Sequence, residues 1–414
     1  MSAGIVIVGG GQAACQLAAS LRQMGYEGVL KMFTEEHHLP YQRPPLSKDF
    51  LKSTSSSDAV QLRPPGFYSS IGCEVRTGLR VERIDRNRKS LEFANGETVA
   101  YGKLVLATGA RARTLSGAQS NGVSIHYLRT VDDANTLREA LGGARQLAIL
   151  GAGYVGMEVA ASAAQRGIAV SVFEAATRVM QRSVGPHISG VVQALHAEHG
   201  VRLHLGSSIE SIRAGASGSA RIVIEAGHAG TFEADALVVG IGADPNMELA
   251  AQAGLDCGRA IRVDANCQTS DPEIFAIGDC TEQTQSPYGV DLRLESVQNA
   301  IDQAKCAAAA LAEKPAPASA VPWFWSDQYD HRIQVAGVFL PSDEVLVRPC
   351  VSQDGSSLRQ SVWYLRGNRV AAVETIDAPE EFMVAKMLIK NASKVAPERL
   401  ADTSLPVQAL LQAA

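Results

Sequence analysis

A glycine pattern able to bind the phosphates of a dinucleotide occurs twice in this sequence. It reads IVIVGGGQAA close to the first residue and AILGAGYVGM in the middle of the chain. In such a pattern the first glycine permits a tight turn, the second lets the backbone approach a pyrophosphate, and a small third residue lets a helix pack closely on a strand. The positions are Gly9, Gly11 and Ala14 in the first copy and Gly151, Gly153 and Gly156 in the second. Each copy predicts a phosphate site at the positive end of a helix.

An acidic residue follows each pattern at the end of the next expected strand. Glu35 closes KMFTE, and Glu174 closes VSVFE. A carboxylate at this place accepts hydrogen bonds from the two hydroxyls of a ribose. One glycine pattern alone would be weak evidence, because an ordinary strand-to-helix turn can look the same. Two copies, each with its acid, indicate a protein that holds two nucleotides.

Glycines also follow three other expected strands. LVLATGA places Thr108 and Gly109 after one strand, VVGIGADPN places Gly242 after a second, and EIFAIGDC places Gly278 and Asp279 after a third. Ligands of doubly wound folds bind at such strand ends. An acid there suits a polyol, although Asp279 taken alone fits a helix cap or an Asx turn somewhat better.

A proline-rich loop, LPYQRPPLSK, follows the first acid and carries the cations Arg43 and Lys48. Its three prolines exclude a regular helix and favour an extended loop beyond a strand end, where a ligand would bind. On local evidence, a solvated surface role explains Arg43 and Lys48 equally well.

The glycines and acids need a strand, a helix and a second strand to position them. In the second copy Val155, Val159 and Ala163 recur at helical spacing. Val75 to Val99 alternates and turns at Asn95-Gly96, which predicts a small antiparallel sheet.

Composition limits the remaining possibilities. The chain has 414 residues, 46% of them apolar, which predicts about three domains with sizeable cores. The net charge of -5 argues against nucleic acid as a partner. No basic leader or cleavage site precedes the first strand, and no apolar run is long enough to cross a bilayer, so a cytoplasmic protein without a membrane partner is expected.

The cysteines show no pattern of a redox or metal site. Seven are scattered with no CxxC and no close pair, so each is interpreted as a small buried residue and no metal site is expected. Reductases that use a cysteine pair beside a flavin are therefore disfavoured.

Residues after the linker LAEKPAPASAVP predict a separate α+β domain, with a boundary near residue 317. Strand-like runs occupy 332–338, 344–348, 361–365 and 369–374, and a helix is expected from Pro379 to about Ala392. Trp323, Phe324 and Trp325 stand at its entrance, and large aromatic residues are by default packing residues.

The order of motifs is more specific than any one of them. IVIVGGGQAA, LPYQRPPLSK, LVLATGA, LRT, ILGAGYVGME, FAIGDC, LRLESVQNA and PWFWSDQ together resemble the FAD-dependent, NADH-linked ferredoxin reductases of bacterial Rieske dioxygenase and soluble cytochrome P450 systems. The resemblance covers essentially the whole chain and includes the reductases of biphenyl dioxygenase and putidaredoxin. It implies an α/β protein with two Rossmann-like nucleotide-binding domains, of the glutathione-reductase type, plus a C-terminal α+β domain. The FAD domain would comprise 1–109 and 236–317, the NADH domain 110–235 and the C-terminal domain 318–414.

The resemblance also implies roles for single residues. The first glycine pattern with Glu35 would bind the adenosine diphosphate of FAD, and the second with Glu174 would bind NADH. Lys48 would pair with Glu158 beside the flavin, where Glu158 could otherwise be a favourable first-turn acid, and Trp325 would lie at the flavin edge. Other residues expected around the cofactors are Arg43, Thr108, Gly109, Arg129, Gly242, Gly278, Asp279 and Val297. Ala14 replaces the third glycine, a change that the pattern permits.

The resemblance implies an oxidoreductase, a ferredoxin–NAD(+) reductase in aromatic hydrocarbon catabolism. FAD would accept a hydride from NADH and pass single electrons to a [2Fe-2S] ferredoxin of the Rieske or P450 type. A reductase of rubredoxin or of a small radical such as monodehydroascorbate would carry the same nucleotide patterns. A non-enzymatic NADH-sensing flavoprotein would be expected to show a targeting segment or a basic patch, which this sequence lacks.

Lysines at positions 386, 390 and 394 repeat at helical spacing, with Arg366 and Arg369 on the preceding hairpin. They form a candidate docking patch for an acidic ferredoxin, although a solvated helix face explains them equally well.

Overall fold

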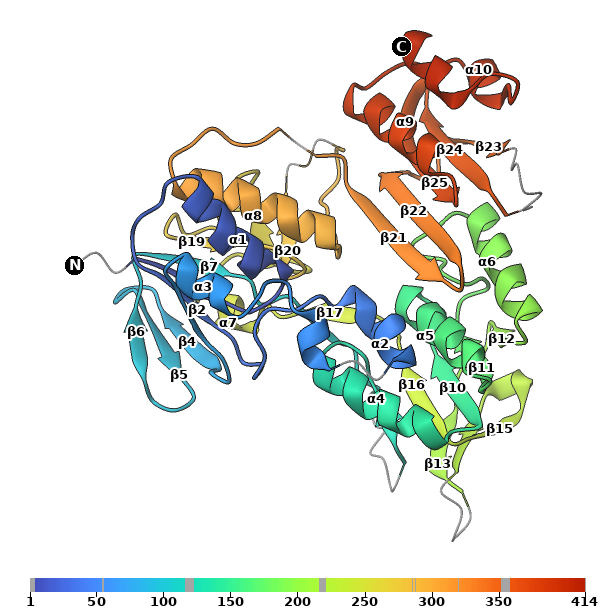
Figure 1. Cartoon of the computed structure of the whole chain (residues 1–414), viewed down its shortest axis with the longest axis horizontal. Helices are drawn as coiled ribbons and strands as arrows, with labels where there is room; N and C mark the ends of the chain where they lie inside the picture. Colours follow the sequence, from blue (N-terminus) through green and yellow to red (C-terminus); the bar gives the residue numbers. More distant parts are fainter. Residues whose placement is uncertain are drawn as a thin grey trace. The chain divides into compact units, whose positions relative to one another are not determined.

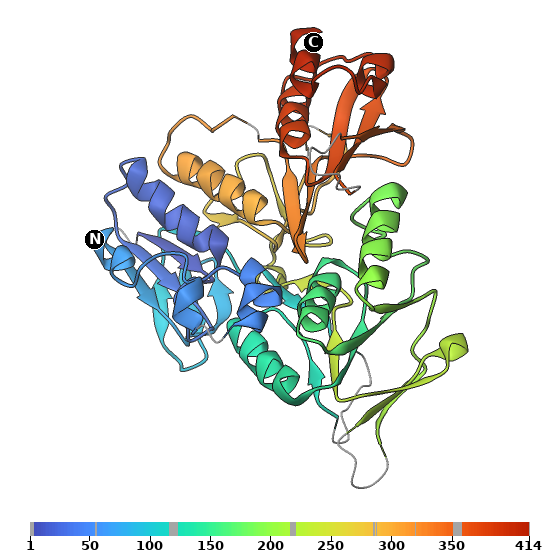
Figure 2. The ribbon, with the colours of Figure 1, turned by 45° about the vertical axis from the view of Figure 1, so that its right-hand side comes forward.

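The computed structural model describes residues 4–53, 56–115, 123–215, 221–284, 286, 288–318, 320–350 and 358–413. The serine-rich stretch Ser53–Ser57 predicts a flexible surface segment, and its residues Thr54 and Ser55 lie outside the described residues. The chain divides into two compact units. The first contains Met1–Gln42, Ser56–Arg111 and Ala243–Pro322, and the second contains Arg43–Ser55, Ala112–Gly242 and Trp323–Ala414. Figures 1 and 2 show the ribbon in two views.

The first unit is built on a five-stranded parallel sheet in the order β19-β7-β1-β2-β3. The strands are β1 (Ile5–Val8), β2 (Leu30–Phe33), β3 (Cys73–Arg76), β7 (Lys103–Leu106) and β19 (Ile274–Ala276). All four residues of β1 are buried, as expected for a central parallel strand covered on both faces.

Alternate residues of β1 serve the two faces of this sheet. Ile5 and Ile7 pack with helices α1 (Gln12–Gln23) and α8 (Val297–Leu311). Val6 and Val8 pack on the opposite side with residues of an antiparallel sheet, β4 (Val81–Asp85), β5 (Ser90–Phe93) and β6 (Thr98–Ala100). The sequence predicted this small sheet and its turn, but Val75 belongs to β3 of the parallel sheet instead.

Short elements complete the first unit and its boundary with the second. They are η2 (Ser57–Val60), α3 (Gly66–Ser70), β8 (Ala110–Ala112), β17 (Ala243–Pro245), α7 (Glu248–Gln252), β18 (Ile261–Val263) and β20 (Thr281–Gln283).

The second unit repeats the arrangement around a parallel sheet in the order β12-β11-β10-β16-β9. Its strands are β9 (Ile125–His126), β10 (Gln146–Leu150), β11 (Ala169–Glu174), β12 (Arg202–Leu205) and β16 (Ala236–Val239). One face packs with α4 (Val131–Gly143), α5 (Tyr154–Gln165) and α6 (Pro186–Glu198), and the other with β13 (Ser211–Ala214), β14 (Ile222–Glu225) and β15 (Thr231–Ala234). The proline-rich loop forms η1 (Pro44–Ser47) and α2 (Asp49–Lys52), and η3 (Gly227–Ala229) precedes β15.

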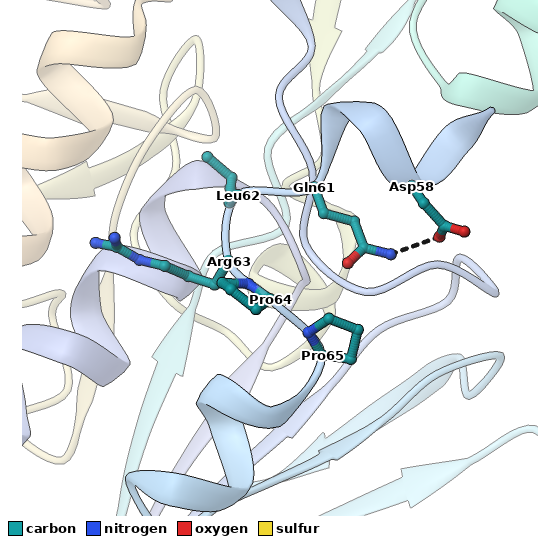
Figure 3. Close-up of a pocket in the computed structure, with 6 residues that line it drawn as sticks. All are labelled: Asp58, Gln61, Leu62, Arg63, Pro64 and Pro65. Carbon is teal, nitrogen blue, oxygen red and sulfur yellow. Dashed lines mark hydrogen bonds between the residues drawn. The ribbon is translucent and has the colours of Figure 1, made fainter. Parts of the chain in front are cut away.

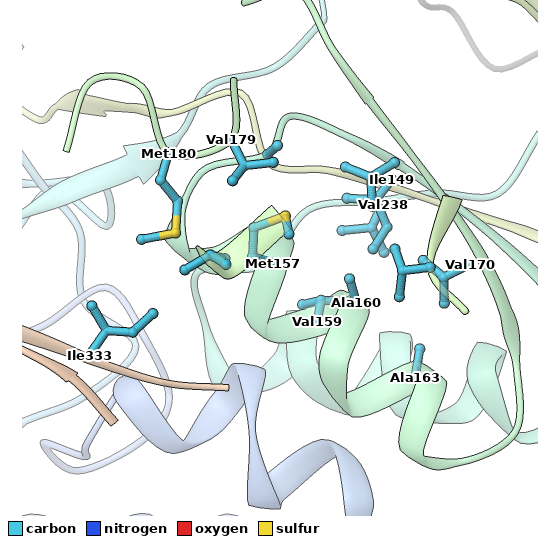
Figure 4. Packing of buried hydrophobic residues seen from close by; sticks show 14 of the residues in the cluster. Ile149, Met157, Val159, Ala160, Ala163, Val170, Val179, Met180, Val238 and Ile333 are labelled. Carbon is cyan, nitrogen blue, oxygen red and sulfur yellow. The ribbon is translucent and has the colours of Figure 1, made fainter. Parts of the chain in front are cut away.

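Helix α5 contributes its buried face to the larger core of this unit. Figure 4 shows Val159 and Ala163 among the residues around Ile149, Val170 and Val238 of the sheet. Val155, the first residue of the expected apolar stripe, is exposed instead. The stripe is therefore shorter than its spacing predicted.

The C-terminal residues form a five-stranded antiparallel sheet in the order β21-β22-β25-β24-β23. The elements are β21 (Trp323–Gln328), β22 (His331–Gly337), β23 (Glu344–Pro349), β24 (Gln360–Arg366), β25 (Arg369–Ile376), α9 (Pro379–Lys390), α10 (Pro397–Ala401) and η4 (Val407–Ala413). The four strands and the helix expected from the sequence are all present. The aromatic run at 323–325 begins a fifth strand, β21. These three aromatic residues are only half-buried, whereas Trp363 is fully buried.

The two compact units do not coincide with the predicted domains. Residues Arg43–Ser55, expected in the FAD domain, belong to the second unit. Strand Ala236–Val239 pairs with β10, so the chain re-enters the first unit at Ala243 and not at residue 236. Residues of β24 and β25 join the core cluster of α5 and α6, and so does Ile333 of β22, which Figure 4 shows. This shared core explains why the C-terminal sheet belongs to the second compact unit. The assignment of FAD, NADH and C-terminal domains stays a prediction. Among the described helices, none is long and apolar enough to cross a membrane.

Candidate functional site

The first glycine pattern connects β1 to α1 in the first unit. Gly9 has φ +118°, and a Cβ atom there would lie 2.1 Å from the carbonyl oxygen of Ala107, so only glycine fits. Ala14 is fully buried. Gly11 precedes α1, no side chain caps this helix start, and a Cβ atom at Gly11 would meet nothing within 4 Å. Packing within the protein therefore explains Gly9 but not Gly11, whose open surroundings suit the approach of a phosphate.

The second pattern connects β10 to α5 in the second unit. It too contains glycines that packing requires and one that packing does not require. A Cβ atom at Gly151 would lie 2.4 Å from the oxygen of Gly240, and one at Gly156 would lie 2.1 Å from the oxygen of Gly151. Gly153 precedes the uncapped start of α5, and a Cβ atom there would meet nothing within 4 Å. Both cradles thus keep a glycine that the fold itself does not require, at a helix start that can bind an anion.

The two acids differ in their surroundings. Glu174 ends β11 as expected, and its carboxylate accepts hydrogen bonds from the N–H groups of Ala152 at 2.7 Å and Ala176 at 2.8 Å, which holds the glycine turn. Glu35 lies beyond the end of β2, which closes at Phe33 and not at Glu35. It pairs with Arg80 at 2.9 Å, with both side chains about two-thirds exposed, so this ion pair contributes little to stability.

Thr108 and Gly109 form a turn that Asn246 holds. The Thr108 hydroxyl donates to the Asn246 carbonyl at 2.6 Å, and the Asn246 amide donates to the Thr108 carbonyl at 2.9 Å. Gly109 has φ +65°, and its carbonyl accepts from the Asn246 N–H at 2.9 Å. No local sequence signal pointed to Asn246, because its partners are far away in the chain.

Gly278 and Asp279 lie in the turn between β19 and β20. Gly278 has φ +82°, and its N–H donates to the buried Gln303 side chain of α8 at 2.7 Å. No described helix begins at Asp279, so the helix-cap alternative is wrong. Val297 is the first residue of α8, whose start is capped by Ser296.

Lys48 and Glu158 form a buried ion pair in the second unit. Lys48 Nζ lies 3.0 Å from Glu158 Oε1, and the two side chains are 14% and 5% exposed. Ser47 donates to the second carboxylate oxygen, and Ser326 of β21 donates to Oε1 at 2.6 Å. A buried ion pair needs such hydrogen bonds to offset desolvation. A solvated surface role for Lys48 is therefore wrong, and Glu158, the fifth residue of α5, lies beyond the first turn.

The second unit also contains four other residues predicted to bind the cofactors: Arg43, Arg129, Gly242 and Trp325. Arg43 directly precedes η1 and donates to the Arg129 carbonyl at 2.6 Å. Trp325 lies on β21 and packs against Trp323 with ring centroids 5.5 Å apart. Gly242 has φ +121° and accepts a hydrogen bond from the Arg113 N–H at 2.9 Å.

The sequence reasoning missed three polar residues behind the ion pair, Ser326, Gln328 and His196, all of them at most 1% exposed. No local signal pointed to them. Positions 326 and 328 lie on the same face of a strand, and two polar residues there ordinarily indicate a solvated face.

A shallow hollow of the first unit is lined by Asp58, Gln61, Leu62, Arg63, Pro64 and Pro65 (Figure 3). The Gln61 amide donates to Asp58 at 2.7 Å across its rim. The hollow contains no residue predicted to bind a cofactor.

The candidate docking patch is smaller than expected. Helix α9 ends at Lys390, and Lys394 lies beyond it in a β-bridge with Arg369. Arg366 is held by Asp343 at 2.8 Å. Lys386 Nζ lies 4.8 Å from the centre of the Trp323 ring.

Comparisons with known proteins agree over nearly the whole chain. A family model described as pyridine nucleotide-disulphide oxidoreductase matches residues 3–304, and one described as reductase C-terminal matches residues 323–411. The ferredoxin–NAD(+) reductase component of the anthranilate 1,2-dioxygenase system of Burkholderia cepacia is 38% identical over 407 residues, 98% of each chain. A rubredoxin–NAD(+) reductase of Pseudomonas putida is 37% identical over 376 residues, 91% of this chain and 96% of that protein. In the crystal structure of the covalent putidaredoxin reductase–putidaredoxin complex, a chain 35% identical aligns with a TM-score of 0.94, covering 99% of this chain and 98% of that one.

The chain belongs to the pyridine nucleotide-disulphide oxidoreductase family. The fold predicted from the sequence is confirmed, and so are FAD and a nicotinamide dinucleotide as the cofactors of this oxidoreductase. The two open helix starts, at Gly11 and Gly153, fit two dinucleotides.

The disulphide in the family's description has no counterpart among the described residues. All seven cysteines lie in the described part of the chain and are free. Four are buried as expected, but Cys257, Cys306 and Cys350 are only half-buried. Each of the Cys267 and Cys306 thiols donates to a backbone carbonyl, of Gln303 and Ala265 respectively. The two thiols are distant in sequence, and the interaction with Cys267 lowers the pKa of the Cys306 thiol.

Proposed function

We propose that this protein is an NADH-dependent ferredoxin reductase that delivers electrons to a [2Fe-2S] ferredoxin of an oxygenase system. The observation that carries the proposal is the similarity, along 98% of the chain, to the ferredoxin–NAD(+) reductase of a dioxygenase system. The match to putidaredoxin reductase, which was crystallised with its redox partner, supports the same class of acceptor.

The proposal assigns the first cradle, with Glu35, to the adenosine diphosphate of FAD and the second, with Glu174, to NADH. FAD, when bound, accepts two electrons as a hydride and releases them singly, which the iron-sulphur acceptor requires. Further residues assigned to the cofactors are Arg43, Lys48, Thr108, Gly109, Arg129, Gly242, Gly278, Asp279, Val297 and Trp325.

Lys48 and Glu158 are assigned a catalytic role in this proposal. Their burial supports it, because a charged pair held by the side chains of Ser47 and Ser326 keeps a fixed orientation that a surface pair would lose. A fixed charge acts on a reacting group without reorganisation during the reaction. Trp325, half-buried on β21, is the aromatic residue assigned to the flavin edge.

The proposed donor is NADH and not NADPH. Glu174 would repel a 2′-phosphate, and Ala175 and Ala176 offer no cation to offset this repulsion. Arg178 is the nearest cation in sequence, but its guanidinium donates to the carbonyls of Val184 and Gln181. A kcat/KM higher for NADPH than for NADH would contradict this assignment.

The acceptor is tested directly. Purified protein reconstituted with FAD is offered NADH and one of three acceptors: a Rieske-type or P450-type [2Fe-2S] ferredoxin, a rubredoxin, or the monodehydroascorbate radical. The proposal expects kcat/KM to be highest for one of the ferredoxins. The rubredoxin reductase at 37% identity makes rubredoxin the second candidate, and a higher kcat/KM for rubredoxin would replace the proposal. A cytoplasmic location stays a prediction, which cell fractionation would test.

A further inference from the structure

Behind the Lys48–Glu158 pair, a chain of buried polar side chains runs through β21 to α6. Ser326 Oγ lies 2.6 Å from Glu158 Oε1, and Gln328 Nε2 lies 3.1 Å from Ser326 Oγ. His196 Nε2 of α6 lies 2.8 Å from Gln328 Oε1. The hydroxyl of Tyr329 lies 3.3 Å from the other nitrogen of the His196 ring.

The donor and the acceptor of every hydrogen bond in this chain follow from the bond between Ser326 and Glu158. An ionised carboxylate only accepts, so the single proton of the Ser326 hydroxyl is donated to Glu158. The Ser326 oxygen must then accept from Gln328, which fixes the amide nitrogen toward Ser326 and the amide oxygen toward His196. An amide oxygen only accepts, so His196 carries its proton on Nε2. The remaining nitrogen of the neutral ring, Nδ1, accepts from Tyr329.

All donors of this chain therefore point toward Glu158. Glu158 is 4% exposed, Gln328 is 1% exposed, and Ser326 and His196 are fully buried, so water does not compete for these bonds. In such surroundings successive hydrogen bonds polarise one another and act together. Burial also lowers the pKa of His196 to about 4, so the ring is neutral at physiological pH and keeps one acceptor nitrogen for Tyr329.

We propose that Ser326, Gln328 and His196 are positioning residues, which fix the orientation of the Glu158 carboxylate opposite Lys48 through a one-directional chain of hydrogen bonds. This inference rests on the proposed function of the ion pair in flavin reduction. It goes beyond that function because it assigns a role to residues outside the ion pair itself.

The chain positions the carboxylate and does not carry protons. Its middle member is an amide, which would have to pass through a high-energy tautomer to relay a proton. The charged and titratable groups around the chain include Lys48 on the loop before α2, and Tyr154 on α5, which also interacts with Glu374. His199 and Tyr329 lie at the far end, where the two rings stack with centroids 3.7 Å apart.

Ser326→Ala removes the donor to Glu158 without adding atoms to a buried site. We expect the rate of flavin reduction by NADH, measured by stopped flow, to fall about tenfold, which equals about 1.4 kcal/mol in activation free energy. The apparent dissociation constant of NADH should change less than about twofold. Ser326→Thr keeps the hydroxyl and should restore most of the rate. The matched control is Ser189→Ala, since Ser189 is also buried and bonds a backbone carbonyl of the same unit, at 2.6 Å from Val179.

Gln328→Glu tests the direction of the chain. A carboxylate at 328 has nearly the shape of the amide, but it accepts the Ser326 proton instead of donating to Ser326. The variant should therefore slow flavin reduction about as much as Ser326→Ala. In a Glu158→Gln background, neither substitution should change the rate by more than about twofold, because both act through Glu158.

A readout independent of turnover is the ¹⁵N spectrum of the histidine rings in apoprotein and holoprotein, with His196 assigned by comparison with His196→Asn. We expect neutral His196 with its proton on Nε2 in the wild type, and a protonated ring near neutral pH in Gln328→Glu, because the new carboxylate favours the imidazolium.

The outcomes distinguish a failure of the ion pair from a failure of the positioning chain. A wild-type rate in both Glu158→Gln and Lys48→Met would refute the role of the ion pair and the positioning chain with it. Slow reduction in those variants but wild-type rates in Ser326→Ala and Gln328→Glu would refute the chain alone. A proton on Nδ1 of His196 would also refute it, because the donors would then not run toward Glu158.

Discussion

Glu374, a fully buried residue on β25, should make the free energy of unfolding depend on pH through its carboxyl group. Its two oxygens accept hydrogen bonds from the Gly185 N–H and the Tyr364 hydroxyl, both at 2.8 Å. These bonds favour the ionised form, but burial outweighs them and raises the pKa of Glu374 to about 7. The Tyr364 hydroxyl lies so close to the Gly185 backbone that a Cβ atom at Gly185 would lie 2.0 Å from its oxygen.

The sign and size of the effect follow from linkage. Between the ordinary glutamate pKa of 4.5 and the value of about 7 in the folded protein, the folded state keeps a proton that the unfolded chain has released. The contribution of Glu374 to the free energy of unfolding is therefore greatest below pH 4.5, decreases as pH rises and is lost above about pH 7. A difference of about 2.5 pKa units corresponds to about 3 kcal/mol.

Glu374→Gln removes this titration and keeps the shape of the neutral acid. Its amide can donate to the Tyr364 hydroxyl, as a protonated carboxyl would. The free energy of unfolding of the variant minus that of the wild type should therefore rise by about 3 kcal/mol as pH increases from 4.5 to 8. Urea unfolding followed by tryptophan fluorescence measures this region, because the three tryptophans, Trp323, Trp325 and Trp363, all lie in the same sheet.

Tyr364→Phe is the companion variant. It removes a bond that favours the ionised form, so the pH-dependent interval should extend to higher pH. A stability difference between Glu374→Gln and wild type that stays constant within about 0.5 kcal/mol from pH 4.5 to pH 8 would show that the carboxyl titrates normally, and the reasoning from burial would be refuted.

Three further predictions concern electron transfer. Lys48→Met should slow flavin reduction by NADH at least tenfold while FAD stays bound, and an unchanged stopped-flow rate would remove the lysine from the reaction. Alkylation of native protein should modify Cys306 first, because the interaction with Cys267 lowers its pKa. NADH oxidation by ferricyanide should stay unchanged after alkylation. Loss of that activity without unfolding would show that a thiol takes part. Charge reversal at Lys386 and Lys390 should slow ferredoxin reduction at low salt. The effect should be smaller near 1 M salt, where the Debye length is about 3 Å, and ferricyanide reduction should not change. Equal effects on both acceptors would remove α9 from the docking surface.

Features that depend on local backbone geometry could be predicted from the sequence alone. Gly9 and Gly151 are predictable because a strand, a tight turn and a helix lie within a few residues, and the turn requires a positive φ that favours glycine. The C-terminal strands and helix are predictable for the same reason, since each has its own periodicity. The match of the motif order to a known family supplied the cofactors.

Contacts between distant segments became visible only in the folded chain. Asn246 holds the Thr108 turn, Cys267 meets Cys306, and the C-terminal sheet shares its core with α5 and α6. In each case the partner lies in another part of the chain, and neither segment records the other in its local pattern.

Burial is the second property that only the fold established. The composition of α5 and of β21 does not reveal that Glu158 and Gln328 are enclosed, and exposure decides whether a charge is a solvated surface group or part of an ordered pair. Glutamate, for example, is exposed at position 35 and fully buried at position 374. The free energy of an ionised group depends on the medium around it, and in a folded chain that medium is supplied by residues from elsewhere in the sequence.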